Sequence, residues 1–154
     1  MRITISILIA VLLVLFLSSC SEPNYIAIVN GEKILVRDFN RNLAQLKQYY
    51  PETEENDLKK YLLEDMIVDK LILQRAKNIT VSESEVEQQY EALLETYASE
   101  QALLQDLQKY GFTKEELLKD IREQLIIAKH LENIENIDNY IEELVQKADI
   151  KIRK

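Results

Sequence analysis

The long stretch from Arg37 to Lys154 contains a single glycine, Gly111, and a single proline, Pro51. Leu, Glu, Lys, Gln and Ala, which all favour helices, dominate the same stretch. Glycine and proline are the strongest breakers of regular structure, so their rarity leaves room for little besides helices joined by short connections. The sequence therefore predicts a mainly α-helical domain.

A small β element is expected to accompany the helices. Residues 25–29 and 32–36 are rich in β-forming side chains and flank Asn30-Gly31, a pair suited to the two positive φ angles of a type I′ hairpin turn. Residues 149–154 alternate apolar and charged side chains, as a half-buried strand does. A lone strand is unstable in water, so we expect it to pair with residues 25–29 as part of one antiparallel sheet.

The spacing of apolar residues predicts about six helices. Two of them begin with a capping box, Ser82 with Glu85 and Thr113 with Glu116. The helix predicted over 57–77 is apolar nearly all round, which indicates a central, buried position. The predicted helices cover about 38–50, 57–77, 82–97, 99–110 and 113–134, with a last one capped by Asp138.

The N-terminus has the pattern of an export signal. A basic residue, Arg2, precedes a largely apolar run from Ile3 to Leu17, which is shorter than a typical membrane span. The sequence Leu17-Ser-Ser-Cys20 then resembles the bacterial lipobox. We therefore predict a signal peptide over 1–19, a lipid on Cys20, a tether over 20–24 and one domain over 25–154. A membrane anchor with an incidental cysteine is the alternative.

Cysteine usage and charge exclude several classes of protein. Cys20 is the only cysteine, so one chain can form neither a disulfide nor a thiolate metal site. Removal of the signal peptide takes Arg2 with it and changes the net charge from −8 to −9. A negative surface without a basic patch argues against nucleic acid, which is bound through neutralisation of its phosphates.

Several segments, taken in order, resemble the N-terminal chaperone domain of SurA and PrsA type folding factors, which is related in helical pattern to trigger factor. The resemblance covers nearly all of residues 25–152, and the order and spacing of its segments are more specific than any one of them. The segments that carry it are Val29–Ile34, Asp38-Phe39, Leu63–Ala76, Ile79–Glu85, Tyr110–Leu117, Asp120–Leu125 and Ala148–Ile152.

The chain departs from the family pattern in two places. Leu35 or Val36 stands where the family commonly has a threonine cap, so the first helix is expected to begin later and to rely on Asp38. Many family members carry a parvulin-type prolyl isomerase domain before the last helix, where this sequence has only Glu135, Asn136 and Ile137. The resemblance therefore implies the chaperone module without the isomerase.

The sequence offers few groups for catalysis. His130 is the sole histidine, and it has no second histidine or cysteine to work with as a base or a metal ligand. The carboxylate pairs at 64–65, 115–116 and 142–143 occur in exposed helical patterns, and there is no glycine-rich phosphate loop. We predict no catalytic residue, no metal and no cofactor other than the covalent lipid at Cys20.

A binding role would need apolar surface beyond the requirements of one small core. Tyrosine offers apolar area with a polar group at its end and suits contacts with varied partners. The alternative interpretation of the same residues is that they simply fill the core. The candidate peptide-binding residues are Tyr90, Leu94, Tyr97, Leu107, Tyr110 and Phe112.

The leading hypothesis is that the protein is a membrane-anchored chaperone. It would hold unfolded polypeptides, among them outer-membrane proteins, without using ATP. A second hypothesis is an assembly lipoprotein that holds one dedicated envelope partner. A third is a protein that carries the name of a prolyl isomerase through its family alone. Ser21 stands where enteric lipoproteins retained at the inner membrane have aspartate, which favours the periplasmic side of the outer membrane; the outer face of a cytoplasmic membrane fits as well.

Overall fold

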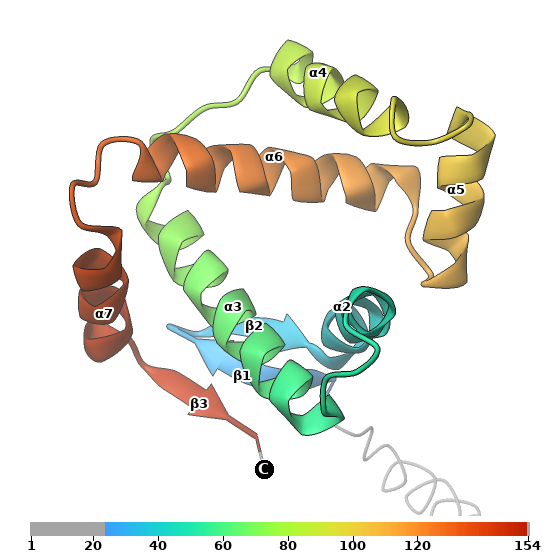
Figure 1. Ribbon diagram of the computed structural model, residues 1–154. Coiled ribbons are helices and arrows are strands. Elements are labelled where there is room, and N and C mark those ends of the chain that lie inside the picture. Colours follow the sequence, from blue (N-terminus) through green and yellow to red (C-terminus); the bar gives the residue numbers. More distant parts are fainter. Residues whose placement is uncertain (1–23, 154) are drawn as a thin grey trace, which may run out of the picture.

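The computed structural model describes residues 24–153 (Figure 1). The predicted signal peptide, the lipidation site at Cys20 and most of the tether lie outside the described residues. The element labels are those of Figure 1. Within the described part, six helices accompany one three-stranded antiparallel sheet, and this confirms the predicted fold class.

The sheet joins the two ends of the domain. β1 (Tyr25–Val29) lies between β2 (Glu32–Leu35) and β3 (Ile150–Ile152), and it is antiparallel to both. The turn between β1 and β2 has positive φ at Asn30 (49°) and Gly31 (87°), as the Asn-Gly pair predicts. The predicted pairing of the C-terminal strand with the hairpin is confirmed.

The helices follow one another with short connections. The capping boxes at Ser82 and Thr113 are both present. Gly111, with a positive φ of 72°, follows the helix that ends at Lys109. The helices are α2 (Val36–Tyr49), α3 (Glu55–Arg75), α4 (Glu83–Leu94), α5 (Glu100–Lys109), α6 (Lys114–Leu131) and α7 (Ile137–Lys147).

Two predicted helix starts are wrong. α2 begins at Val36, without a side-chain cap, instead of relying on Asp38. The backbone N–H of Val36 donates to the carbonyl of Asn24, so the residue just before β1 supplies a partner that a cap residue would otherwise provide. α7 is capped by Asn136 instead of Asp138. Asparagine and aspartate cap equally well, so the local sequence does not choose between them.

Two apolar cores hold the two sides of the molecule. α3 packs against β1, α2, α6 and α7, which confirms its predicted central position. The core around α3 is continued by the buried side chains of the sheet and of α2. A separate core joins α4, α5 and the first half of α6, with Tyr90, Leu103, Leu107 and Phe112 buried in it.

α6 connects the two cores. Its first turns contribute Leu117, Leu118 and Ile121 to the core of α4 and α5, and its later turns contribute Ile127 and Leu131 to the core around α3. Figure 1 shows α4 along one side of α6. On the other side of α6 lies the C-terminal end of α3, and α2 lies near the N-terminal end of α3. Side chains of α2, α3 and α6 line one groove.

Candidate functional site

An open groove of about 500 Å³ lies between α2, α3 and α6. This volume lies within the range of about 300–1,000 Å³ that is usual for ligand-binding clefts. Its apolar surface comes from β2, α3 and α6. The apolar lining residues are Ile34, Leu35, Leu62, Met66, Leu73 and Ile127.

One wall of the groove is a single face of α6. Glu116, Asp120, Glu123 and Ile127 all line the groove, at intervals of three or four residues that place them on one side of a helix. The opposite side of the same helix carries the apolar residues that pack on α4 and α5. The burial of that apolar face therefore fixes the acidic face toward the groove.

The facing wall comes from α3. Asp65 and Asp69, four residues apart, line the groove from this helix. The side-chain amide of Gln124 on α6 donates to Asp69 Oδ2 at 2.8 Å and links the two walls. Carboxylates of two different helices therefore approach one another across the groove.

The position of these carboxylates affects their ionisation. Burial raises the pKa of Asp65, Asp69 and Asp120 above the ordinary value of an aspartate. Repulsion adds to burial in two cases, since Asp65 and Glu123 raise the pKa of Asp69 and Glu123 raises that of Asp120. The groove thus holds negative charge in a setting that is partly withdrawn from water.

The end of the groove between α2 and α6 is closed by ion pairs. Arg41 Nη1 lies 2.7 Å from Glu116 Oε1, and its Nη2 lies 3.4 Å from Asp38 Oδ1. Arg37 adds a longer contact to Glu116, at 3.5 Å. The hydrogen bond from Arg41 is the main cause that lowers the pKa of Glu116 below its ordinary range, and the hydrogen bond from the Thr113 N–H is the second. Glu116 thus caps its own helix and ties that helix to α2.

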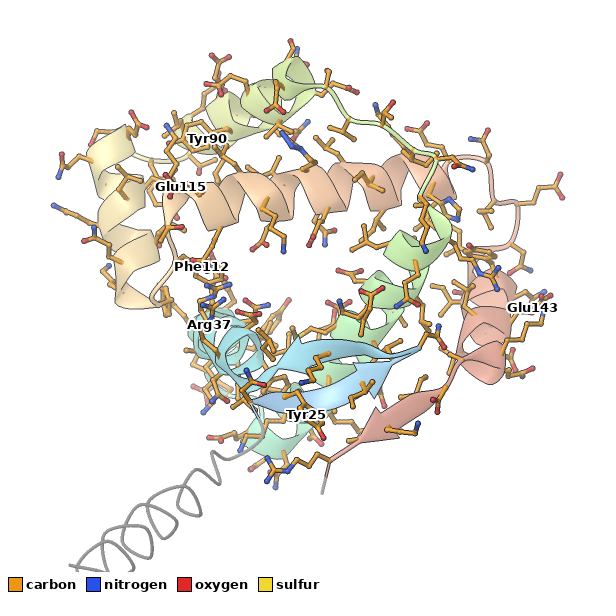
Figure 2. The ribbon with its side chains drawn as sticks, turned by 180° about the vertical axis from the view of Figure 1, so that it is seen from behind. Tyr25, Arg37, Tyr90, Phe112, Glu115 and Glu143 are labelled. Carbon is orange, nitrogen blue, oxygen red and sulfur yellow. The ribbon has the colours of Figure 1, made fainter. Side chains whose placement is uncertain are left out.

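The six residues predicted to bind peptides gather in one cluster, around the core of α4, α5 and the start of α6. Tyr90, Leu107 and Phe112 are buried there, whereas Leu94, Tyr97 and Tyr110 are only partly buried. Figure 2 shows Tyr90 between α4 and α6, and Phe112 near Arg37 at the junction with α2. The first three are therefore core residues in this structure, and a peptide-binding role for the set stays a prediction.

The partly buried tyrosines extend toward α2. The Tyr110 hydroxyl donates to the Gln48 side chain, and the Tyr97 hydroxyl donates to Asp106 Oδ2 at 3.2 Å. Burial and then Asp106 raise the pKa of Tyr97, with smaller effects of Tyr49 and Tyr110. Tyr49, Tyr50 and Tyr61 are more than half exposed. The candidate set thus omitted exposed aromatic surface at the end of α2 and in the first half of α3.

Sequence reasoning missed the charged lining of the groove. The signal was present in the spacing of Glu116, Asp120 and Glu123 on α6 and of Asp65 and Asp69 on α3. Such spacing is usual for solvent-exposed helix faces, so it could not by itself identify a groove. The angle between α3 and α6 makes the difference, because it turns two polar faces toward each other.

The sole histidine is engaged in a structural contact. His130 Nε2 lies 2.6 Å from the hydroxyl oxygen of Tyr140 and joins α6 to α7. Within residues 24–153, no group of three or more His, Cys, Asp or Glu side chains is arranged to hold a metal ion. In the same range no helix has both the length and the apolar character needed to cross a membrane.

The domain is mainly helical, and a small sheet joins its two ends. A groove with charged and apolar lining lies between α2, α3 and α6. The model of the SurA-like N-terminal domain matches residues 1–131, and the chain belongs to this family of chaperones and foldases. Similar proteins include the foldase protein PrsA of Clostridium botulinum strains Hall and Langeland, each 30% identical over 131 residues that cover 71% of this chain. The matched part amounts to 39% of those relatives, about two fifths of their length.

Proposed function

We propose that this protein is a chaperone of the cell envelope that binds unfolded polypeptide segments in the groove between α2, α3 and α6. The observation that carries the proposal is the groove itself, where the side chains of Met66, Leu73 and Ile127 lie beside charged groups on two helices. Unfolded chains expose apolar side chains together with polar backbone, and a lining of both kinds suits them. Family membership supports the same conclusion.

The proposed activity is holding, without ATP. The sequence has no glycine-rich phosphate loop. Arg37, Arg41, Lys70 and Lys119 of the groove already pair with carboxylates of the protein. We also propose that the domain acts by binding alone, without prolyl isomerisation. A protease-coupled assay on a prolyl peptide should then show no rate above the uncatalysed one.

We further propose that a lipid on Cys20 anchors the domain. The support is the lipobox-like Leu17-Ser-Ser-Cys20 after an apolar run. Mass spectrometry of the protein extracted from bacterial membranes should find a diacylglycerol-modified Cys20, and Cys20→Ser should release the chain from the membrane fraction. Placement at the outer membrane, rather than the cytoplasmic one, stays a prediction that density fractionation of the envelope can check.

The experiment that tests holding is light scattering of several chemically unfolded proteins, diluted into buffer with and without residues 21–154 at near-stoichiometric amounts. Unfolded outer-membrane proteins belong among these clients. We expect suppression of aggregation for most of them. No effect on any client would contradict general holding and would favour the alternative, an assembly lipoprotein with one dedicated folded partner.

The position of the bound segment can be tested by photo-crosslinking. A benzoylphenylalanine at Asp120 lies in the groove, and one at Glu143 lies on the outer side of α7, as Figure 2 shows for Glu143. Crosslinks to unfolded clients should form from position 120 and be scarce from position 143. Equal labelling from both positions would contradict binding in the groove.

A further inference from the structure

The charges that line the groove are not all neutralised within the protein. Arg37 and Arg41 pair with Asp38 and Glu116 at the closed end of the groove. The two cations of α3 and α6 that line the groove are also engaged. Lys70 pairs with Glu32 of the sheet at 3.3 Å, and Lys119 pairs with Glu123 along α6 at 3.3 Å.

Three carboxylates remain after these pairs are assigned. Among residues 24–153, no cationic side chain lies within ion-pair distance of Asp65, Asp69 or Asp120. Asp69 accepts only the neutral amide of Gln124 from α6. Lys33, the other cation of the lining, lies 5.2 Å from the centre of the Tyr25 ring. Arg41 and Lys119 lower the pKa of Asp120 from a greater distance. None of the three carboxylates in the middle of the groove, however, has an ion-pair partner of its own.

This charge lies directly beside the apolar lining. Met66 lies three residues before Asp69 on α3, Leu73 lies four residues beyond Asp69, and Ile127 lies seven residues beyond Asp120 on α6. Side chains at such spacings share one helix face. A ligand in the groove therefore meets carboxylates and apolar side chains within the same short distance.

We propose that the groove selects unfolded segments in which apolar residues alternate with lysine or arginine, the cationic side chain lying between Asp65 and Asp69 of α3 and Asp120 of α6. This inference rests on the proposed function and names the class of segment that the groove prefers. A cation supplies the charge that the protein lacks at this position, and a neighbouring apolar side chain covers Met66 and Leu73. An acidic segment meets repulsion at the same place.

Partial burial makes the pairing worth more here than on an open surface. Burial raises the pKa of each of the three aspartates, and Asp69 and Asp120 are only partly exposed, whereas Asp65 is exposed. An incoming ammonium or guanidinium group gains more from such a carboxylate than from a fully hydrated one. The apolar contacts supply affinity that is common to many segments, and the charge supplies the preference among them.

The test measures the fluorescence anisotropy of three labelled peptides that share one apolar frame, as each binds to the soluble chain of residues 21–154. The variable positions carry lysine, glutamine or glutamate. We expect the lysine peptide to bind about fivefold more tightly than the glutamine peptide, and the glutamate peptide to bind least. The preference should shrink in high salt, because the pairs are partly exposed.

The variant D69N/D120N removes two of the three charges with little change of shape, and it should bring the preference for lysine over glutamine close to one. The control E142Q/E143Q makes the same change of net charge on the exposed outer side of α7 and should keep the preference. Carbodiimide coupling of the lysine peptide to the unaltered protein gives a second readout, with crosslinks expected at Asp65, Asp69 or Asp120 in mass spectra.

Equal affinity for all three peptides would overturn the proposed selectivity while leaving the groove as a peptide site. A preference for lysine that survives in D69N/D120N, together with crosslinks elsewhere, would also overturn it. The proposed function fails separately, through absence of any peptide binding and of any suppression of aggregation.

Discussion

The guanidinium carbon of Arg41 lies 3.7 Å from the centre of the Phe112 ring. Arg41 belongs to α2 and Phe112 to the core of α4 and α5, so this stacked pair joins the two sides of the molecule. The same guanidinium pairs with Glu116 at 2.7 Å, and only 9% of the Arg41 side chain is exposed. One side chain thus combines a cation–π contact with a mostly buried ion pair at the closed end of the groove.

Replacement of Arg41 by methionine should lower the free energy of unfolding by about 1–3 kcal/mol, because Glu116 loses its main cation and Phe112 loses the stacked group. Urea denaturation followed by circular dichroism measures the change. Arg75→Met, on the exposed surface of α3, is the control and should shift the midpoint little. An unchanged midpoint in Arg41→Met would contradict a stabilising role for this contact.

Truncation of Leu103 to alanine should destabilise the protein by about 2–5 kcal/mol, because the side chain is 1% exposed and lies among Tyr90, Leu107 and Phe112. The measurement is the same denaturation experiment. Gln105→Ala, at an exposed position of the same helix, is the matched control and should stay within about 0.5 kcal/mol. A small loss in Leu103→Ala would show that the α4 and α5 core relaxes to fill the space.

Alanine at Gly31 or at Gly111 should cost about 1–2 kcal/mol at either position, because the φ angles are +87° and +72°. A methyl group meets no atom within 4 Å at either position, so the cost comes from the backbone alone. Asparagine tolerates positive φ better and should recover part of the loss. Thermal unfolding of the alanine and asparagine variants checks this order, and an alanine variant as stable as the parent would contradict it.

Glu85 should make the domain sensitive to acid. A hydrogen bond from Lys129, followed by those from Ser82, lowers the pKa of Glu85 from 4.5 to about 2. Because the folded value lies below the unfolded one, the stabilisation is complete above about pH 4.5 and is lost as the pH falls toward 2. The difference in stability between the parent and Glu85→Gln should therefore be largest near neutral pH and vanish near pH 2. A difference that stays constant with pH would rule this linkage out.

Asp120 should show the opposite trend. Burial, and then Glu123, raise its pKa in the folded state, so ionisation costs stability above the folded value and the cost disappears below the unfolded one. Asp120→Asn should therefore be more stable than the parent at neutral pH, by less than about 1 kcal/mol because solvent screens the charges, and equal to it in acid. Glu142→Gln, which removes a charge from the exposed side of α7, is the control. Lower stability of Asp120→Asn at neutral pH would refute this explanation.

Much of the fold could be predicted from short stretches of the sequence. The Asn30-Gly31 turn and the capping boxes at Ser82 and Thr113 depend on residues within a few positions of one another, so their patterns are visible without the fold. The wrong helix starts have a different cause. The first turn of α2 takes a partner from Asn24 across the sheet, and two equivalent caps compete at the start of α7.

The candidate site was harder to predict. The aromatic and leucine residues chosen for peptide binding do cluster, but Tyr90, Leu107 and Phe112 are consumed by a core of their own. Hydrophobicity alone does not distinguish a residue that fills a core from one that lines a groove, because both positions favour apolar side chains. The carboxylates of the groove have the spacing of an ordinary solvent-exposed helix face, so the sequence could not distinguish a groove lining from such a face.

The sequence by itself determined the helical content, the hairpin, the caps and the acidic face of α6, because each depends on backbone preferences and on the period of one helix. Only the tertiary structure decided that this face meets Asp65 and Asp69 across a groove of about 500 Å³. The approach of the two helix faces depends on the position of α6, which contributes side chains to two cores, and on the angle between α3 and α6. Both are set by the packing of side chains that are distant in sequence.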